Sequence, residues 1–157
     1  MPAKRKINLG ALIYGFGHHP GSWLLPNVPK NAAIDINYHK KLAQIAERGT
    51  LDFLFYADGL AFSDPGRRGR VPKATNKLEP ITLITALSGA TSHLGFIATV
   101  STSYSEPYNV ARQLASADHI SGGRIGWNVV TTDDQEAAGN FGGLAIPPDE
   151  RYARARE

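Results

Sequence analysis

The sequence lacks cysteine and has no long apolar run. Without thiols, the chain cannot form a disulfide, a thiolate zinc site or a cysteine nucleophile, and a reducing compartment is compatible with its composition. The apolar runs stay short of the roughly 18 residues that a membrane span needs. The basic start, residues 1–6, is not followed by the apolar core and cleavage site of a signal peptide. We therefore expect a soluble, cytoplasmic protein that does not enter a membrane.

Charge of one sign is also not in large excess, because the formal net charge is only +3. Hydrophobic residues make up 42% of the 157 residues, enough for one domain, residues 1–157, with a real core. One dense basic cluster, Arg67, Arg68, Arg70 and Lys73, lies among glycines and prolines, which predicts a loop. It is either a solvated loop or a contact for an anionic substrate or phosphate. Nucleic-acid binding is disfavoured, because no aromatic residue is interleaved with these charges.

Short apolar segments alternate with helical patterns along the chain. Each segment is nearly continuous in apolar residues, as is typical of parallel strands that are covered on both faces. The expected strands are Ile7–Tyr14, Leu51–Asp58, Leu94–Ser101 and Arg124–Val130. Strand and helix repeated in this way predict an α/β protein with a parallel sheet.

The segments between the expected strands carry helix start and stop signals. Asp35 can cap a helix that ends at Gly49. Pro80 and Pro107 suit the first turns of the next two helices. The Ser121-Gly122-Gly123 sequence ends the third helix just before a strand.

Two architectures fit this alternation. A doubly wound sheet could be complete at this length, whereas a (β/α)8 TIM barrel needs roughly 250 residues, so that four βα units would be its N-terminal half. A last helix is expected to begin near Asp149 and to be cut off at Glu157, which favours a truncated barrel. The long connections, residues 15–29, 59–77 and 131–148, all follow strands. In a barrel that end carries the chemistry.

Two motifs in the first long connection invite other functions. The glycines at 15, 17 and 21 resemble a dinucleotide fingerprint, but the third is one place late and no helix follows directly. His18 and His19 could bind a metal ion. Adjacent histidines seldom converge without a nearby carboxylate, so solvent-exposed loop histidines are the favoured interpretation.

Polar residues at strand ends are the stronger candidates for a site. Asp58 ends an apolar strand, where it is either a local loop cap or a site residue, and Thr99 and Ser101 share one face of the next strand. Asn128 lies within a buried strand, where its amide needs a partner, either a heteroaromatic ligand edge or a neighbouring strand end. No catalytic triad or pair of carboxylates is evident, and the catalytic residues stay unknown. If the chain is enzymatic, a bound cofactor therefore supplies the reactivity.

Residues 118–131, Asp-His-Ile-Ser-Gly-Gly-Arg-Ile-Gly-Trp-Asn-Val-Val-Thr, closely resemble a segment of the bacterial luciferase-like flavin-dependent monooxygenases. The match is to the group that contains nitrilotriacetate monooxygenase component A, dibenzothiophene-sulfone monooxygenase and long-chain alkane monooxygenase. Supporting matches lie, in order, at residues 51–58, 78–80, 98–102, 137–141 and 150–155.

The resemblance implies a TIM barrel that binds reduced FMN supplied by a separate flavin reductase. Such an enzyme uses O2 to transfer one oxygen atom to a small organic substrate. The flavin contacts of the family correspond to Asp58, Thr99, Asn128 and Tyr152. The substrate stays open among aminopolycarboxylates, sulfones, sulfides and alkanes, and the arginine cluster leans towards an anionic one.

The chain also departs from the family pattern. Pro148 stands where relatives usually carry a histidine, and Leu24-Leu25-Pro26 replaces their Arg-His-Pro. The second half of the barrel is absent, and open sheet edges favour association into a homo-oligomer. Two alternatives therefore remain: a non-catalytic fragment or half-barrel partner, and a barrel hydrolase with a metal on His18, His19 and Asp58.

Overall fold

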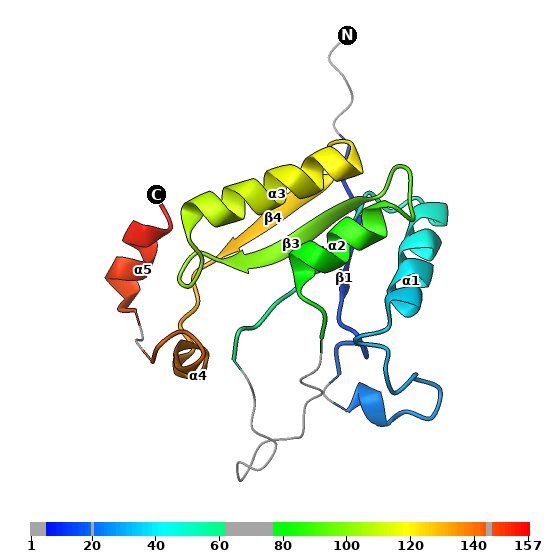
Figure 1. Cartoon of the computed structure of the whole chain (residues 1–157). Helices are drawn as coiled ribbons and strands as arrows, with labels where there is room; N and C mark the ends of the chain where they lie inside the picture. Colours follow the sequence, from blue (N-terminus) through cyan, green and yellow to red (C-terminus); the bar gives the residue numbers. More distant parts are fainter. Residues whose placement is uncertain (1–5, 20, 62–76, 144–145) are drawn as a thin grey trace.

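The computed structural model describes residues 6–19, 21–61, 77–143 and 146–157. Figure 1 shows the chain alternating between strands and helices along most of its length. The main elements run in the order β1 (Gly10–Ile13), α1 (Ile36–Arg48), β2 (Phe53–Tyr56), α2 (Pro80–Ser88), β3 (Gly95–Ser101), α3 (Pro107–Ser121) and β4 (Ile125–Val130). Three short helices complete it: η1 (Ser22–Leu24), α4 (Gln135–Gly139) and α5 (Pro148–Arg154).

The sheet has four parallel strands in the order β1-β2-β3-β4. A doubly wound sheet reverses its strand order at a switch point, whereas a barrel adds each new strand beside the previous one. The sequential order therefore decides between the two architectures left open by the sequence. The prediction of an N-terminal half-barrel with about four βα units is confirmed.

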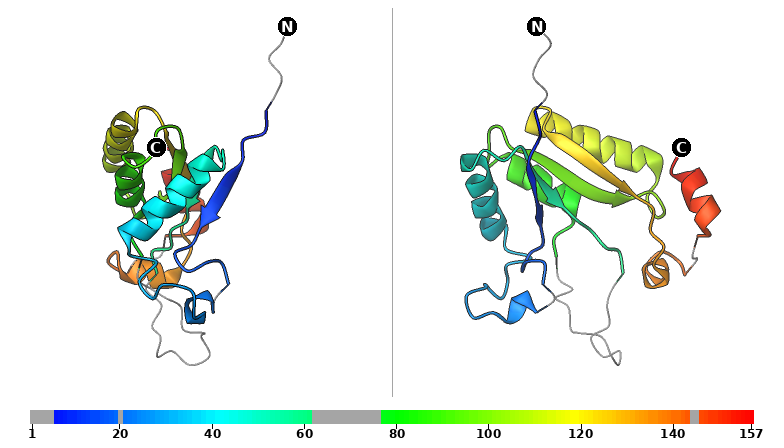
Figure 2. Two further views of the ribbon diagram at one scale, coloured as in Figure 1. Left: turned by 90° about the vertical axis from the view of Figure 1, so that its right-hand side faces the viewer. Right: turned by 180° about the vertical axis from the view of Figure 1, so that it is seen from behind.

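Helices α1, α2 and α3 cover one face of the sheet, as the left view of Figure 2 shows. Leu54 and Phe96 are paired neighbours on this face, and they join a core that includes residues from α1, α2 and α3. The opposite face carries Leu12, Phe55 and Ile97 in one row across the sheet. In a closed barrel this second face is the interior.

Local chemistry explains where the helices begin and end. The Asp35 carboxylate accepts hydrogen bonds from the backbone N–H groups of Asn37 and Tyr38, as the capping prediction requires. Pro80 occupies the first turn of α2, where a missing N–H costs nothing. Glu79, which the sequence analysis passed over, caps that helix with both carboxylate oxygens.

Two strands are shorter than the sequence pattern predicted. β1 begins at Gly10 rather than Ile7, and β2 covers Phe53–Tyr56 rather than residues 51–58. Beyond the start of β1, the Asp52 N–H donates to the Leu9 carbonyl at 2.8 Å, while the Leu9 N–H donates to the Asp52 carboxylate at 2.7 Å. Apolar periodicity cannot locate the end of a strand so closely, because it records the polarity of side chains and not the partners of backbone groups.

The end of the chain also differs from expectation. The short helix α4 was not predicted, because its five residues are too few for a periodic pattern. The last helix begins at Pro148 but ends at Arg154, before the final residues. The N–H groups of residues 156 and 157 bond to carbonyls three positions back, as is common in the last turn of a helix.

The amino ends of the strands are closed by two polar side chains. The Arg124 guanidinium donates hydrogen bonds to the carbonyls of Ser88, Thr91 and Leu94 and of Ser121, which joins the ends of α2 and α3. One oxygen of the Glu47 carboxylate accepts three backbone N–H groups, those of residues 92, 93 and 94. These bonds stabilise the amino ends of the strands, and the long loops lie at the carboxyl ends.

Candidate functional site

The connections that follow β2, β3 and β4 meet at the carboxyl edge of the sheet. Asn140, just after α4, donates a hydrogen bond of 2.8 Å to the carbonyl of Leu60 in the connection after β2. Tyr104, after β3, stacks on Phe141 with ring centroids 4.5 Å apart. Three separate segments thus form one rim, where the barrel prediction placed the site.

Thr99 and Asn128 lie side by side on the inner face of the sheet at this end. They are register partners on β3 and β4, and the Asn128 amide donates a 3.0 Å hydrogen bond to the Thr99 hydroxyl. This bond uses one N–H of the amide, so a carbonyl oxygen and a second N–H remain for another partner. The two expected site residues therefore lie on the same face of the sheet and are joined by a hydrogen bond.

The hydroxyl residues beyond Thr99 have a structural role instead. The Thr132 hydroxyl donates to the Ser101 hydroxyl at 2.6 Å, and the Ser103 hydroxyl accepts the N–H of Thr132 at 3.0 Å. Thr102 donates its hydroxyl proton to the Val130 carbonyl. These bonds fasten the ends of β3 and β4 together, which accounts for the run of hydroxyl residues seen in the sequence.

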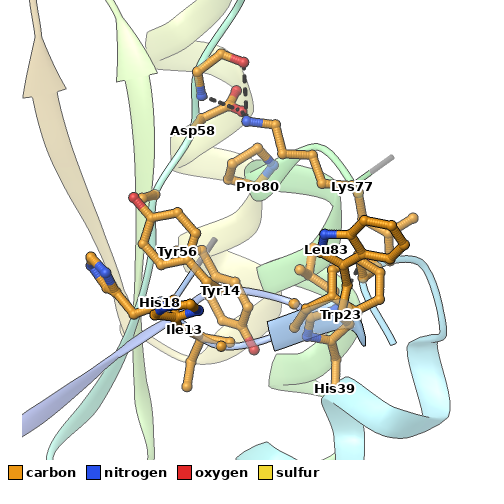
Figure 3. Close-up of a pocket in the computed structure, with 18 of the residues that line it drawn as sticks. Ile13, Tyr14, His18, Trp23, His39, Tyr56, Asp58, Lys77, Pro80 and Leu83 are labelled. Carbon is orange, nitrogen blue, oxygen red and sulfur yellow. Dashed lines mark hydrogen bonds and ion pairs between the residues drawn. The ribbon is translucent and has the colours of Figure 1, made fainter. Parts of the chain in front are cut away.

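A cavity of about 490 Å³ lies beside the carboxyl ends of β1 and β2. Figure 3 shows aromatic side chains around it, with the Asp58–Lys77 ion pair at one end. Its wall includes Tyr14, Trp23 and Tyr56, together with Pro80 and Leu83 from α2. The space is therefore mostly apolar with a few polar groups, the usual character of a small-molecule site.

Asp58 is held firmly at the end of this cavity. Its Oδ1 accepts the Gly59 N–H at 2.8 Å and also contacts the Lys77 ammonium. The Asp58 side chain is only 15% exposed. The carboxylate is thus ordered by neighbouring residues before any ligand arrives.

His39 and Tyr56 form a buried part of the wall that the sequence analysis missed. Burial lowers the pKa of the His39 imidazole, although the Ala33 carbonyl and Asp35 act in the opposite direction. Burial also raises the pKa of the Tyr56 phenol. His39 follows Ile36 and precedes Ala43 and Ala46 on the buried side of α1, and this periodicity could have identified it.

Tyr152 lies elsewhere. It is 62% exposed on α5, and among the described residues it has no hydrogen bond. The wall of the cavity contains Asp58 but not Thr99, Asn128 or Tyr152. Of the four expected flavin contacts, the structure therefore brings only Thr99 and Asn128 into direct contact.

The remaining candidate residues contact only their neighbours in the sequence or lie outside the described residues. The ring nitrogen Nδ1 of His19 accepts the Gly21 N–H, and His18 packs edge-on against Tyr14. Within the described ranges, no three His, Asp or Glu side chains gather into a group that could hold a metal ion. The arginine and lysine cluster at residues 67–73 falls outside the described residues. No helix of the described ranges is long and apolar enough to span a bilayer.

The parallel sheet in sequential order, with helices on one face and long loops at its carboxyl edge, defines the N-terminal part of a (β/α)8 barrel with a rim site. Residues 17–157 match the luciferase-like monooxygenase family, and the chain belongs to that family. The family predicted from residues 118–131 and the supporting motifs is thus confirmed.

Named relatives support this membership. The chain is 46% identical to N-acetyl-S-(2-succino)cysteine monooxygenase from Bacillus subtilis, with 98% of this chain and 34% of that protein aligned. It is 42% identical to nitrilotriacetate monooxygenase component A from Aminobacter aminovorans, with 100% and 37% aligned. The chain thus spans about a third of the length of these curated relatives.

Solved structures agree. EDTA monooxygenase from Chelativorans sp. BNC1 superimposes with a TM-score of 0.87 at 36% identity, over 97% of this chain and 35% of that one. Riboflavin lyase, solved with a modified FMN and riboflavin, gives 0.85 at 34% identity, over 97% and 36%. The fold of this chain is therefore found in a monooxygenase and in a relative that was solved with a modified FMN.

Proposed function

We propose that this chain is the N-terminal part of an FMN-dependent monooxygenase, which uses reduced FMN and O2 to oxygenate a small organic substrate. The observation that carries the proposal is the Thr99–Asn128 pair on the inner face of the sheet, at the carboxyl edge. Family membership and the rim position of this pair support it.

The donor set of the pair suits a flavin ring. The Asn128 amide keeps one acceptor and one donor after its bond to Thr99. The edge of the isoalloxazine ring alternates carbonyl oxygens with ring nitrogens, so an amide can bond it through both groups. Asp58 and Tyr152 are the further proposed contacts, at the cavity end and on α5.

When bound, reduced FMN would supply the electrons that activate O2. The residues of this chain would hold the ring edge through Asn128 and Thr99. The apolar cavity wall, with Trp23 and Tyr56, would admit the substrate and keep water away from the reacting atoms.

The other partners are also part of the proposal. One relative is named as a component A, which implies a second component in that system, and we propose a separate flavin reductase for this protein as well. The substrate class stays among aminopolycarboxylates, organosulfur compounds and alkanes, as the names of relatives span all of these.

A flavin titration tests the proposal directly. FMN fluorescence is followed as the chain is added, under oxidising conditions and after anaerobic reduction. We expect saturable binding that Asn128→Leu weakens about tenfold or more, because the half-buried amide would be lost with both of its ring contacts. The control Asn37→Leu, on the exposed side of α1, is expected to bind as the wild type does. Absence of saturable binding by the wild-type chain would contradict the proposal.

A second candidate is a non-catalytic half-barrel that associates with another half. The observation that favours it is the open inner face, where Leu12 is 43% exposed on the edge strand β1. This candidate predicts a chain that associates but shows no saturable flavin binding, so the flavin titration separates the two.

A further inference from the structure

Lys77 lies at the same end of the cavity as Asp58 and joins both ends of the connection between β2 and α2. Its ammonium group pairs with Asp58 Oδ1 and donates a 3.0 Å hydrogen bond to the carbonyl of Gly59. Asp58 and Gly59 follow β2, whereas Lys77 stands just before α2. Figure 3 shows the lysine reaching across to the carboxylate above Pro80.

The two carboxylate oxygens of Asp58 have different contacts. Oδ1 accepts both the Gly59 N–H and the Lys77 ammonium, whereas Oδ2 has no hydrogen bond to the described residues. An ionised carboxylate is acceptor-only, so Oδ2 can bind only a group that carries a proton. A flavin offers such groups as a ring N–H and as ribityl hydroxyls. Lys77 and the Gly59 N–H therefore both hold Oδ1, which leaves Oδ2 without a partner among the described residues and able to bind a ligand.

The positive charge of Lys77 also offsets the negative charge of the Asp58 carboxylate. FMN carries a phosphate, and a half-buried carboxylate next to an anionic ligand weakens binding unless a cation offsets it. Lys77 is the sole lysine or arginine in the described wall of the cavity. Its side chain is 44% exposed while that of Asp58 is 15% exposed, so the cation screens the carboxylate from its solvent side.

We propose that Lys77 is a positioning residue for the flavin. It acts through Asp58, by orienting the carboxylate and offsetting its charge, and makes no contact with the ligand itself. This inference rests on the proposed function, because it needs Asp58 to face FMN. A lysine that contacted the phosphate or an anionic substrate directly would act independently of Asp58.

A double-mutant cycle separates the two roles. The dissociation constant of FMN is measured for the wild type, Lys77→Met, Asp58→Asn and the double variant. We expect Lys77→Met alone to weaken binding about fivefold to tenfold, because it leaves an unpaired carboxylate beside an anion. In the Asp58→Asn background, the same lysine substitution should change the constant less than twofold, since nothing remains for the lysine to position.

Two further variants and one flavin-independent measurement control the cycle. Lys77→Arg should recover most of the affinity, because a guanidinium can bond both Asp58 and the Gly59 carbonyl. Lys41→Met, which removes an exposed lysine from α1, should match the wild type. Without flavin, the Gly59 amide should exchange its hydrogen several-fold faster in Lys77→Met than in Lys41→Met.

Each outcome decides between named alternatives. Additive effects of Lys77→Met and Asp58→Asn would show that the lysine contacts the ligand directly, which overturns the positioning role. Unchanged binding by Lys77→Met, in a chain that binds FMN, also overturns it. A wild-type chain that does not bind FMN overturns the proposed function first, and that result is visible before any variant is made.

Discussion

Arg124 holds together two helix ends that the sequence places far apart. Its guanidinium bonds four backbone carbonyls and the Thr91 hydroxyl. Arg124→Met leaves these carbonyls without donors, so we expect the free energy of unfolding to fall by about 2–4 kcal/mol. Urea unfolding measures the change. Arg112→Met, exposed on α3, is expected to stay within about 0.5 kcal/mol of the wild type.

Glu47 gives the protein a pH dependence on the acidic side. Backbone N–H groups, that of His93 first, lower the pKa of this carboxylate below the 4.5 of an unperturbed glutamate. A lowered pKa in the folded state adds stability above the unfolded pKa, and this stability is lost as the pH falls through the folded value. Glu47→Gln should therefore have a lower urea midpoint at pH 7, and the gap should close below pH about 4. Glu150→Gln, exposed on α5, should show no comparable gap.

His39 acts in a higher pH range. Because burial lowers the pKa of this imidazole, the unfolded state takes up a proton near pH 6.5 while the folded state does not. Stability is therefore complete above that pH and declines below it, by at most about 1.4 kcal/mol per pH unit. His39→Phe should flatten this slope between pH 7 and 5 in urea unfolding series. His119→Gln, on the exposed end of α3, should leave the slope largely unchanged; an equal flattening would contradict the assignment.

At the scale of the element, Gly122 ends helix α3 in the left-handed conformation, with φ 73° and ψ 40°. A Cβ built there meets no atom within 4 Å, so the cost of Gly122→Ala is conformational and not steric. We expect a loss of about 1–2 kcal/mol. Gly139→Ala is a matched control, because its Cβ also meets nothing but its φ is ordinary. Thermal unfolding should show Gly139→Ala unchanged or slightly more stable.

For the whole molecule, we expect the open inner face and the two edge strands to govern association. Leu12 on β1 is 43% exposed on the inner face, and Leu9, just before β1, is 60% exposed. We expect light scattering to show a mass that rises with protein concentration, and Leu12→Lys to reduce this rise by placing a charge on the apolar face. Ile45→Lys is the control, because Ile45 is similarly exposed, at 47%, but lies on α1 outside the sheet. Equal effects of both variants would contradict a role for the inner face.

The sequence by itself determined the main strands and helices and the α/β class of the fold. Asp35, Pro80 and Gly122 act locally, through caps and fixed backbone angles, so their effect on the helices can be predicted without knowing what packs against them. Continuous apolar runs predicted buried parallel strands, and the long connections after strands indicated the functional edge. For Thr99 and Asn128, the sequence predicted only that both are polar residues of neighbouring strands and not that they bond to each other.

Only the tertiary structure decided which groups meet. The strand order, which chose a half-barrel over a doubly wound sheet, depends on backbone pairing between segments that are distant in sequence. The Lys77–Asp58 pair and the buried His39 likewise depend on how the connections fold back over the strands. Side-chain periodicity is a local property, whereas these contacts depend on the three-dimensional path of the chain, and for that reason the sequence pattern could not specify them.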